Sequence, residues 1–269
     1  MTLPRRNWSD MTWTDFRAPD VADWIAVLPV AATEQHGPHL PLSTDADIMR
    51  GYLDLVQARL PADLPATFLP IQTIGLSPEH RDFPGSLSLA PEPALRTWIG
   101  LGADIARTGI RKLVLLSSHG GNNALLDVAA RELRMTRNML AVTSSLARLG
   151  YPDGLFSENE IRHGIHGGDI ETSLMLAFRP DLVRRDRIGD FPAETVRMEH
   201  DFELLRAARP AGFGWMTQDL NPDGAIGDAS AASAEKGKAA AEYGAQRLIT
   251  LLRDVAAFPL ERLRAGPLG

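Results

Sequence analysis

The stretch WIAVLPVAATEQHGPHLPLSTD, residues 24–45, contains one complete strand–loop–helix unit. Its apolar run, Trp24–Ala31, predicts a buried strand, and the polar and turn-forming residues 33–43 predict a loop. A helix is expected to begin near Thr44 and to end before Pro61, because the apolar residues that follow Thr44 have helical spacing. These apolar residues are Ile48, Tyr52, Leu53, Val56 and Leu60.

The same unit recurs along the chain. Residues 112–116 (KLVLL) predict a second buried strand, followed by a loop at 117–122 and a helix at 123–137. Short apolar strands that alternate with amphipathic helices are typical of an α/β domain with a largely parallel sheet. We expect one domain over residues 1–269, with further strands at 68–74 and 140–144 and further helices at 91–108, 170–178 and 234–255.

Composition excludes several classes of protein and site. With 269 residues, 44% of them hydrophobic, the chain can bury a sizeable core. Its net charge of −6 argues against a general nucleic-acid binder, and the absence of cysteine excludes disulfides, thiolate metal sites and cysteine nucleophiles. No apolar run is long enough for a membrane span or resembles a signal peptide, so we expect no membrane partner and a cytoplasmic location.

The first candidate site follows the strand at 24–31. Glu34 and His36 are two residues apart, and residues at this spacing in an extended backbone project to the same face. Asp45 lies at the start of the next helix, where the intervening loop could return it to the pair. Two carboxylates and an imidazole are suitable ligands for Zn²⁺, Mn²⁺ or Fe²⁺.

The second candidate site is the His-Gly-Gly-Asn sequence at 119–122, directly after the strand at 112–116. Ligands of parallel sheets bind at the carboxyl ends of the strands, so His119 is expected to join Glu34 and His36 there as a metal ligand. Gly120 and Gly121 would let substrate approach the backbone. We expect substrate contacts from Gly120, Gly121, Asn122 and, from a separate polar loop, His80.

The third candidate site is HGGDIE at 166–171, a glycine-containing loop followed by the first turn of a helix. Amide hydrolysis needs a general acid because nitrogen leaves poorly unless it is protonated. His166 is our candidate for that acid, with Glu171 as the alternative. Each of these residues alone is more often structural, but three such segments at strand ends and helix starts favour a shared metal site.

These motifs resemble those of the creatininase family. The matching blocks are LPV at 28–30, EQHGPHLP at 34–41 with Asp45, FPGSLS at 83–88, HGGN at 119–122, HGG at 166–168 with ETS at 171–173, and GAIGD at 224–228 with AEKG at 234–237. The resemblance implies a three-layer αβα sandwich with two divalent metal ions. It also implies that Asp45 bridges the ions, that Glu34 and His119 complete one site, and that His36 serves the other.

Two departures from creatininase itself concern the second ion and the substrate. Gly121 stands where creatininase has a carboxylate ligand, so Glu171 is expected to be the fifth ligand. Gly120 and Arg162 stand where creatininase has aromatic residues around its substrate. The His-Gly-Gly-Asn version is instead similar to relatives that hydrolyse formamides or, as in mycofactocin maturation, peptide bonds.

The sequence therefore predicts an amidohydrolase in which metal-activated water cleaves the C–N bond of a cyclic amide, a formamide or a small peptide-like substrate. The resemblance also suggests a homo-oligomer such as a hexamer. Two alternatives remain open. One is a metal-dependent isomerase or lyase that acts on a sugar-like substrate, and the other is a non-catalytic binding or scaffold relative.

Overall fold

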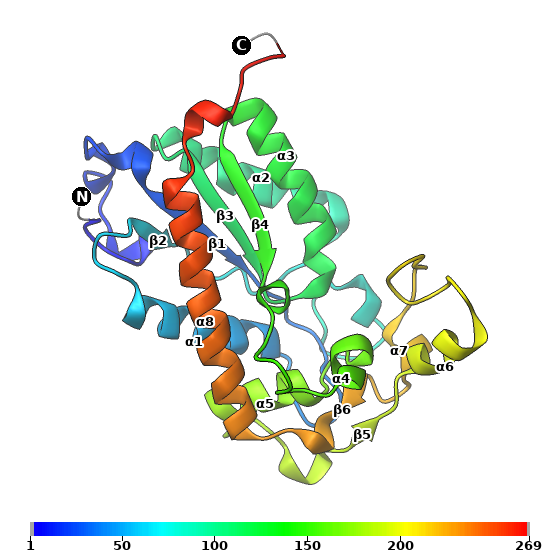
Figure 1. Cartoon of the computed structure of the whole chain (residues 1–269). Coiled ribbons are helices and arrows are strands. Elements are labelled where there is room, and N and C mark those ends of the chain that lie inside the picture. Colours follow the sequence, from blue (N-terminus) through cyan, green and yellow to red (C-terminus); the bar gives the residue numbers. More distant parts are fainter. Residues whose placement is uncertain (1–2, 268–269) are drawn as a thin grey trace.

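The computed structural model describes residues 3–267, which form a four-stranded parallel sheet with helices on both faces (Figure 1). The strands lie in the order β2-β1-β3-β4. Their bounds are Ile25–Val30 for β1, Ala66–Phe68 for β2, Lys112–Ser117 for β3 and Leu140–Ser145 for β4. All three pairings are parallel, as the sequence predicted.

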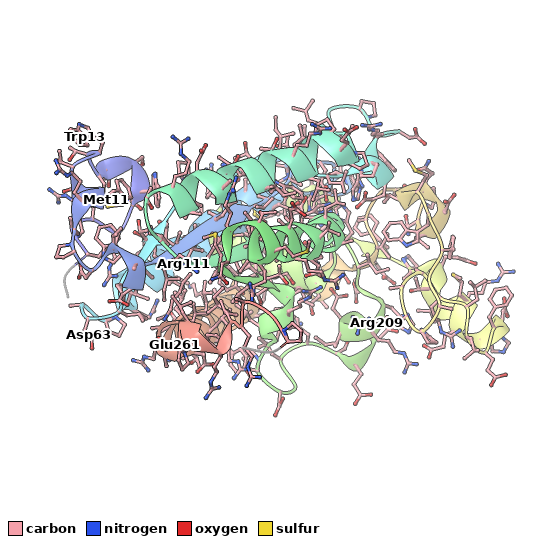
Figure 2. The ribbon with its side chains drawn as sticks, turned by 90° about the horizontal axis from the view of Figure 1, so that it is seen from above. Met11, Trp13, Asp63, Arg111, Arg209 and Glu261 are labelled. Carbon is pink, nitrogen blue, oxygen red and sulfur yellow. The ribbon has the colours of Figure 1, made fainter. Side chains whose placement is uncertain are left out.

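Three helices pack together in the core on one face of the sheet, and two cover the other face. The first group is α1 (Thr44–Arg59), α5 (Asp169–Phe178) and α8 (Ala234–Ala257). The second group is α2 (Pro91–Arg107) and α3 (Asn123–Arg137), which lie side by side in Figure 2. This arrangement confirms the expected three-layer αβα architecture.

Alternate residues of the central strands enter two separate cores. Ile25 and Val27 of β1 pack with α1, α5 and α8, whereas Ala26 and Leu28 pack with α2 and α3. Successive side chains of a strand point to opposite faces, so a strand covered on both sides must be apolar throughout. All six residues of β1 are buried, which explains the unbroken apolar run in the sequence.

One expected strand is wrong in position. Residues 68–74 were expected to form a strand, but β2 occupies Ala66–Phe68, and beyond it only Gln72 forms an isolated bridge to Val30. Pro70 cannot donate a ladder hydrogen bond, so it interrupts the pairing. The other expected strands and helices agree with the structure to within two residues at each end.

Smaller elements gather beyond the carboxyl ends of the strands (Figure 1). The sequence did not predict these elements, which are α4 (Glu158–His163), α6 (Glu194–Asp201), α7 (Thr217–Leu220) and the antiparallel pair β5 (Asp190–Phe191) and β6 (Gly227–Asp228). Within residues 3–267, no helix combines the length and the apolar character needed to cross a membrane.

Gly237 allows α8 to cross α5 at close range. A Cβ atom at position 237 would lie 1.9 Å from the carbonyl oxygen of Ser173, so Gly237→Ala must move one helix. We expect it to lower the free energy of unfolding by about 1–3 kcal/mol. Gly100→Ala is the control, because nothing lies within 4 Å of its Cβ and alanine is the better helix former. Urea unfolding measures the free energy of unfolding of both variants. Equal stability of the two variants would contradict the close crossing.

Candidate metal centre

The loop after β1 brings Glu34, His36 and Asp45 together. The amide of Glu34 donates to the carbonyl of Leu42 over 3.1 Å, and His36 forms an antiparallel bridge with Leu40, so the loop doubles back on itself. Asp45, in the first turn of α1, then has Oδ2 3.8 Å from His36 Nε2. The loop therefore returns the second carboxylate to the pair.

His119 reaches the same place from the neighbouring strand. Val30 and Ser117 are opposite each other in the register of β1 and β3, so the loops that follow these strands start side by side. His119 Nδ1 lies 3.1 Å from Glu34 Oε1 and 3.9 Å from Asp45 Oδ2. The imidazole and both carboxylates are thus close enough to bind one cation together.

The start of α5 supplies the third contribution. Glu171 Oε2 lies 3.8 Å from His36 Nε2 and accepts a 2.6 Å hydrogen bond from the amide of Gly167. His166 lies between two other imidazoles, with ring centroids 4.0 Å from His36 and 4.3 Å from His80. All three segments expected to form the site therefore meet at one edge of the sheet.

The donor atoms form three groups, two of which share Asp45. These two are Glu34, Asp45 and His119, and His36, Asp45 and Glu171; the third is Glu34, His36 and His166. The donor atoms of each group lie within 4.8 Å of one another. Within residues 3–267, Glu34 Oε2, His36 Nε2 and Asp45 Oδ2 are buried and have no hydrogen-bond partner. Buried polar atoms are normally paired, so this unpaired set of nitrogen and carboxylate donors fits divalent cations.

Backbone carbonyls orient two of the imidazoles. His36 Nδ1 lies 3.1 Å from its acceptor, the carbonyl of Glu34, which leaves Nε2 directed at Asp45 and Glu171. His119 Nε2 lies 3.0 Å from the carbonyl of Leu76, which leaves Nδ1 directed at Glu34. Metal-binding histidines usually donate their second N–H in this way, because the bond fixes the tautomer and the ring.

Burial and the nearby carboxylates together set the pKa values of the site. Burial, together with the charge of Glu34, raises the pKa of Asp45 well above its usual range. Burial alone would lower the pKa of His119, but Glu34 and the other nearby carboxylates outweigh it, so that this pKa is raised. Burial lowers the pKa of His36 and of His166 to about 4. The cluster thus combines buried carboxyl groups with two imidazoles, those of His36 and His166, that stay neutral at ordinary pH and are free to bind a cation.

A pocket of about 250 Å³ opens over the donors. Gly120, Gly121 and His80 line it, together with His166 and Glu171. His80 Nδ1 lies 2.9 Å from the amide nitrogen of the Gln35 side chain, and its Nε2 lies 3.3 Å from Glu34 Oε1. His80 is therefore placed to orient Glu34 as well as to face the pocket.

Asn122 occupies a different place from the one expected. Its Oδ1 accepts from the amide of Leu76 over 2.9 Å, and its Nδ2 donates to the carbonyl of Ala31 over 3.1 Å. The described residues that line the pocket do not include Asn122. Its side chain joins the loops after β1 and β3 to the loop at residue 76, so its position favours a supporting role rather than contact with substrate.

The comparisons with known proteins identify the family. A family model described as creatinine amidohydrolase matches residues 9–252. The chain belongs to the creatininase family. It is 31% identical over 262 residues to the creatinine amidohydrolase of Pseudomonas putida, covering 91% of this chain and 95% of that enzyme. It is 32% identical over 221 residues to the mycofactocin precursor peptide peptidase of Mycobacterium ulcerans, covering 80% of this chain and 79% of that enzyme.

Solved creatininase structures agree with this assignment. A creatininase mutant complexed with creatine superimposes with a TM-score of 0.76 at 27% identity, covering 96% of this chain and all of that one. A manganese form of creatininase gives a TM-score of 0.74 at 28% identity, covering 94% and 98%, and a mutant form of creatininase described as Zn-Zn also matches. These relatives are hydrolases of C–N bonds, and this chain is accordingly a metal-dependent amidohydrolase of the same family.

Trp215 is a pocket residue that the sequence did not reveal. It lines the pocket from the segment between α6 and α7, and its Nε1 donates to the carbonyl of Ala207 over 2.9 Å. Arg162, which stands near an aromatic position of creatininase, instead forms an ion pair with Glu199 on the outside of α4. A lone tryptophan in a segment without clear periodicity gives no signal of its function, so only the structure could place it.

Gly121 leaves the space that keeps His119 and Glu79 in position. A Cβ at 121 would lie 2.4 Å from His119 Nε2 and 2.7 Å from Glu79 Oε1, whereas nothing lies within 4 Å of a Cβ at 120. We expect Gly121→Ala to displace His119 and weaken zinc binding about 10- to 100-fold, with Gly120→Ala as the matched control. Competition with a chromophoric chelator measures both affinities. Equal zinc affinity of the two variants would show that the space has no such role.

Proposed function

We propose that this chain hydrolyses a small amide at two divalent cations that share Asp45. Glu34 and His119 would complete one cation site, and His36 with Glu171 the other. The observation that carries the proposal is the pair of donor groups with Asp45 in common, lying beneath a pocket lined by Gly120, Gly121 and His80. Zinc, manganese and iron are the metals that this donor set accepts.

The chemistry follows from these placements. When bound, the cations would polarise the substrate carbonyl and lower the pKa of a water molecule from about 15.7 to about 7. The Nε2–H of His166 donates to the carbonyl of Gln35, so the neutral ring keeps its lone pair on Nδ1, which lies 3.8 Å from Glu34 Oε1. His166 can accept a proton there and transfer it to the leaving nitrogen. Gly120 and Gly121 leave the wall of the pocket free of side chains beside His119.

The proposed substrate is a small molecule that contains a cyclic amide, a formamide or a short peptide bond. We further propose that residues 1–269 act as one catalytic domain and that the chain forms a homo-oligomer such as a hexamer. The family match over residues 9–252 supports the first of these statements, and resemblance to creatininase supports the second.

Labelled water tests the reaction class. Metal-reconstituted protein is offered a panel of cyclic amides, formamides and short peptides in water enriched in heavy oxygen. We expect one labelled oxygen in the carboxylate product of every substrate that is cleaved, because water supplies that atom. The amine leaves as a separate product from a formamide or a peptide and stays on the opened ring of a cyclic amide. Product that carries no labelled oxygen would contradict hydrolysis and favour the isomerase or lyase alternative.

Asp45→Asn tests whether the two cation sites share this residue. Because Asp45 belongs to both donor groups, we expect the purified variant to retain neither cation and to lose all measurable turnover. Asp54→Asn is the matched control, since Asp54 is an exposed residue on the same helix. Elemental analysis of metal content is the measurement; full occupancy in Asp45→Asn would refute the shared ligand.

His166→Gln and Glu171→Gln separate proton transfer from coordination. We expect Glu171→Gln to lower metal content from two ions to about one per chain, because Glu171 belongs to only one donor group. We expect His166→Gln to keep both ions and to lower kcat by about 10²- to 10⁴-fold. Metal content and kcat are measured on the same preparations. If Glu171→Gln retains both ions, the fifth ligand must be reassigned.

A further inference from the structure

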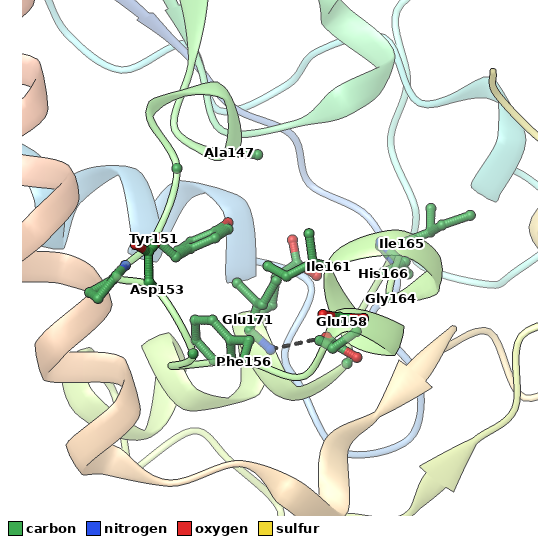
Figure 3. Close-up of a pocket in the computed structure, with 16 residues that line it drawn as sticks. Ala147, Tyr151, Asp153, Phe156, Glu158, Ile161, Gly164, Ile165, His166 and Glu171 are labelled. Atoms are coloured by element: carbon green, nitrogen blue, oxygen red, sulfur yellow. Dashed lines mark hydrogen bonds between the residues drawn. The ribbon is translucent and has the colours of Figure 1, made fainter. Parts of the chain in front are cut away.

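A second, larger cavity, shown in Figure 3, shares lining residues with the pocket over the donors. Its volume is about 630 Å³, within the usual range for small-molecule sites. Ile165, His166 and Glu171 line both the cavity and the pocket. The two spaces therefore meet at the residues to which we assign proton transfer and the fifth metal ligand.

The wall of this cavity is largely apolar. Tyr151 and Phe156 pack edge to face, with ring centroids 5.2 Å apart, and Ile161 and Ile165 line another part of the wall. Figure 3 shows these side chains around a common space. Ile161 is 56% exposed even though it is a large apolar residue, so a ligand in the cavity could bury it further.

The charged residues of the cavity all have the same sign. Among the described residues that line it, four are acidic and none is Lys or Arg. Glu160 is turned into the protein, where it accepts from the amide of Ile170 over 3.2 Å, and Glu171 belongs to the metal centre. Asp153 and Glu158 are exposed and are left facing the solvent side of the cavity.

We propose that the larger cavity binds the non-reacting part of the substrate, and that this part is an apolar, ring-containing group ending in a protonated amine. The inference rests on the proposed function, because it places the reacting amide in the smaller pocket. Aromatic walls suit a ring, and the acidic residues disfavour a terminal carboxylate or phosphate. On this proposal the substrate is larger than a single small heterocycle, because it extends from the pocket of about 250 Å³ over the donors into the cavity of about 630 Å³.

Hydroxamates test this inference without requiring turnover, because the hydroxamate group chelates bound metal ions. Acetohydroxamate is the short probe. The long probes carry a phenylpropyl group on the carbonyl carbon or on the nitrogen, and each is made with a para aminomethyl, methyl or carboxylate substituent. Binding to the zinc-loaded protein is measured by calorimetry. In one of the two series, we expect the methyl probe to bind about ten- to a hundredfold tighter than acetohydroxamate, as for the burial of a phenylalanine side chain.

Variants separate the apolar wall from the acidic residues. We expect Ile161→Trp to fill the cavity and remove the advantage of every long probe, while acetohydroxamate binds as before. The aminomethyl probe should bind about two- to tenfold tighter than the methyl probe, and the carboxylate probe more weakly. The double variant Asp153→Asn, Glu158→Gln should abolish this order, whereas Asp104→Asn, on the exposed side of α2, should preserve it.

The outcomes distinguish the two proposals. If acetohydroxamate binds but no long probe gains affinity, the cavity is not a substrate site and the proposed function stands. If the long probes gain affinity but the carboxylate probe binds as tightly as the aminomethyl probe, the proposed amine is wrong. If acetohydroxamate itself fails to bind the metal-loaded protein, the proposed metal centre is refuted and the inference with it.

Discussion

The burial of two carboxylates side by side is the constraint on which the site depends. Glu34 and Asp45 are 0% and 1% exposed, and each ionised carboxylate taken out of water costs on the order of several kcal/mol unless opposite charge lies nearby. His119 supplies part of that charge, but burial keeps His36 and His166 neutral at ordinary pH. A divalent cation can supply the missing positive charge, because carboxylates and neutral imidazoles can both bind it. This explains why Glu34 Oε2, His36 Nε2 and Asp45 Oδ2 are buried without a hydrogen-bond partner among the described residues.

Two of the loops that carry the donors follow adjacent strands of the sheet, β1 and β3. Because Val30 lies opposite Ser117, Glu34 and His119 need only short loops to come within 3.1 Å of each other. The third contribution comes from α5, which packs against α8 through the close approach at Gly237. Donors held by strand ends and packed helices keep their geometry better than donors on free loops. The packing of the core therefore determines where the metal-binding side chains lie.

The sequence could predict the parts of this design that depend on local patterns. The apolar run at 25–30 forms β1, and the side chains of Glu34 and His36 meet within 4.8 Å; both patterns depend on residues close together in the chain. The roles of Trp215 and Asn122 depend instead on contacts between distant segments. The bond from Gln35 to the carbonyl of Gly224 joins residues 189 positions apart, and no periodicity encodes such a pair. The strand predicted at 68–74 was wrong because the prediction followed the apolar run and gave too little weight to Pro70, which removes a donor from the ladder.

The structure separates the residues that bind cations from those that shape the space above them. The donors come from the loops at 31–45 and 117–122 and from the start of α5, whereas the walls come from residues 147–165 and from Trp215. Trp215 lines the pocket over the donors, whereas Arg162, near an aromatic position of creatininase, is on the outside, so a different segment supplies the aromatic side chain of that pocket. Because the walls come from other segments than the donors, a change in a wall residue need not alter a metal ligand. Family membership therefore fixes the chemistry of the site more closely than the substrate, and this chain is similar both to a creatinine amidohydrolase and to a precursor peptide peptidase.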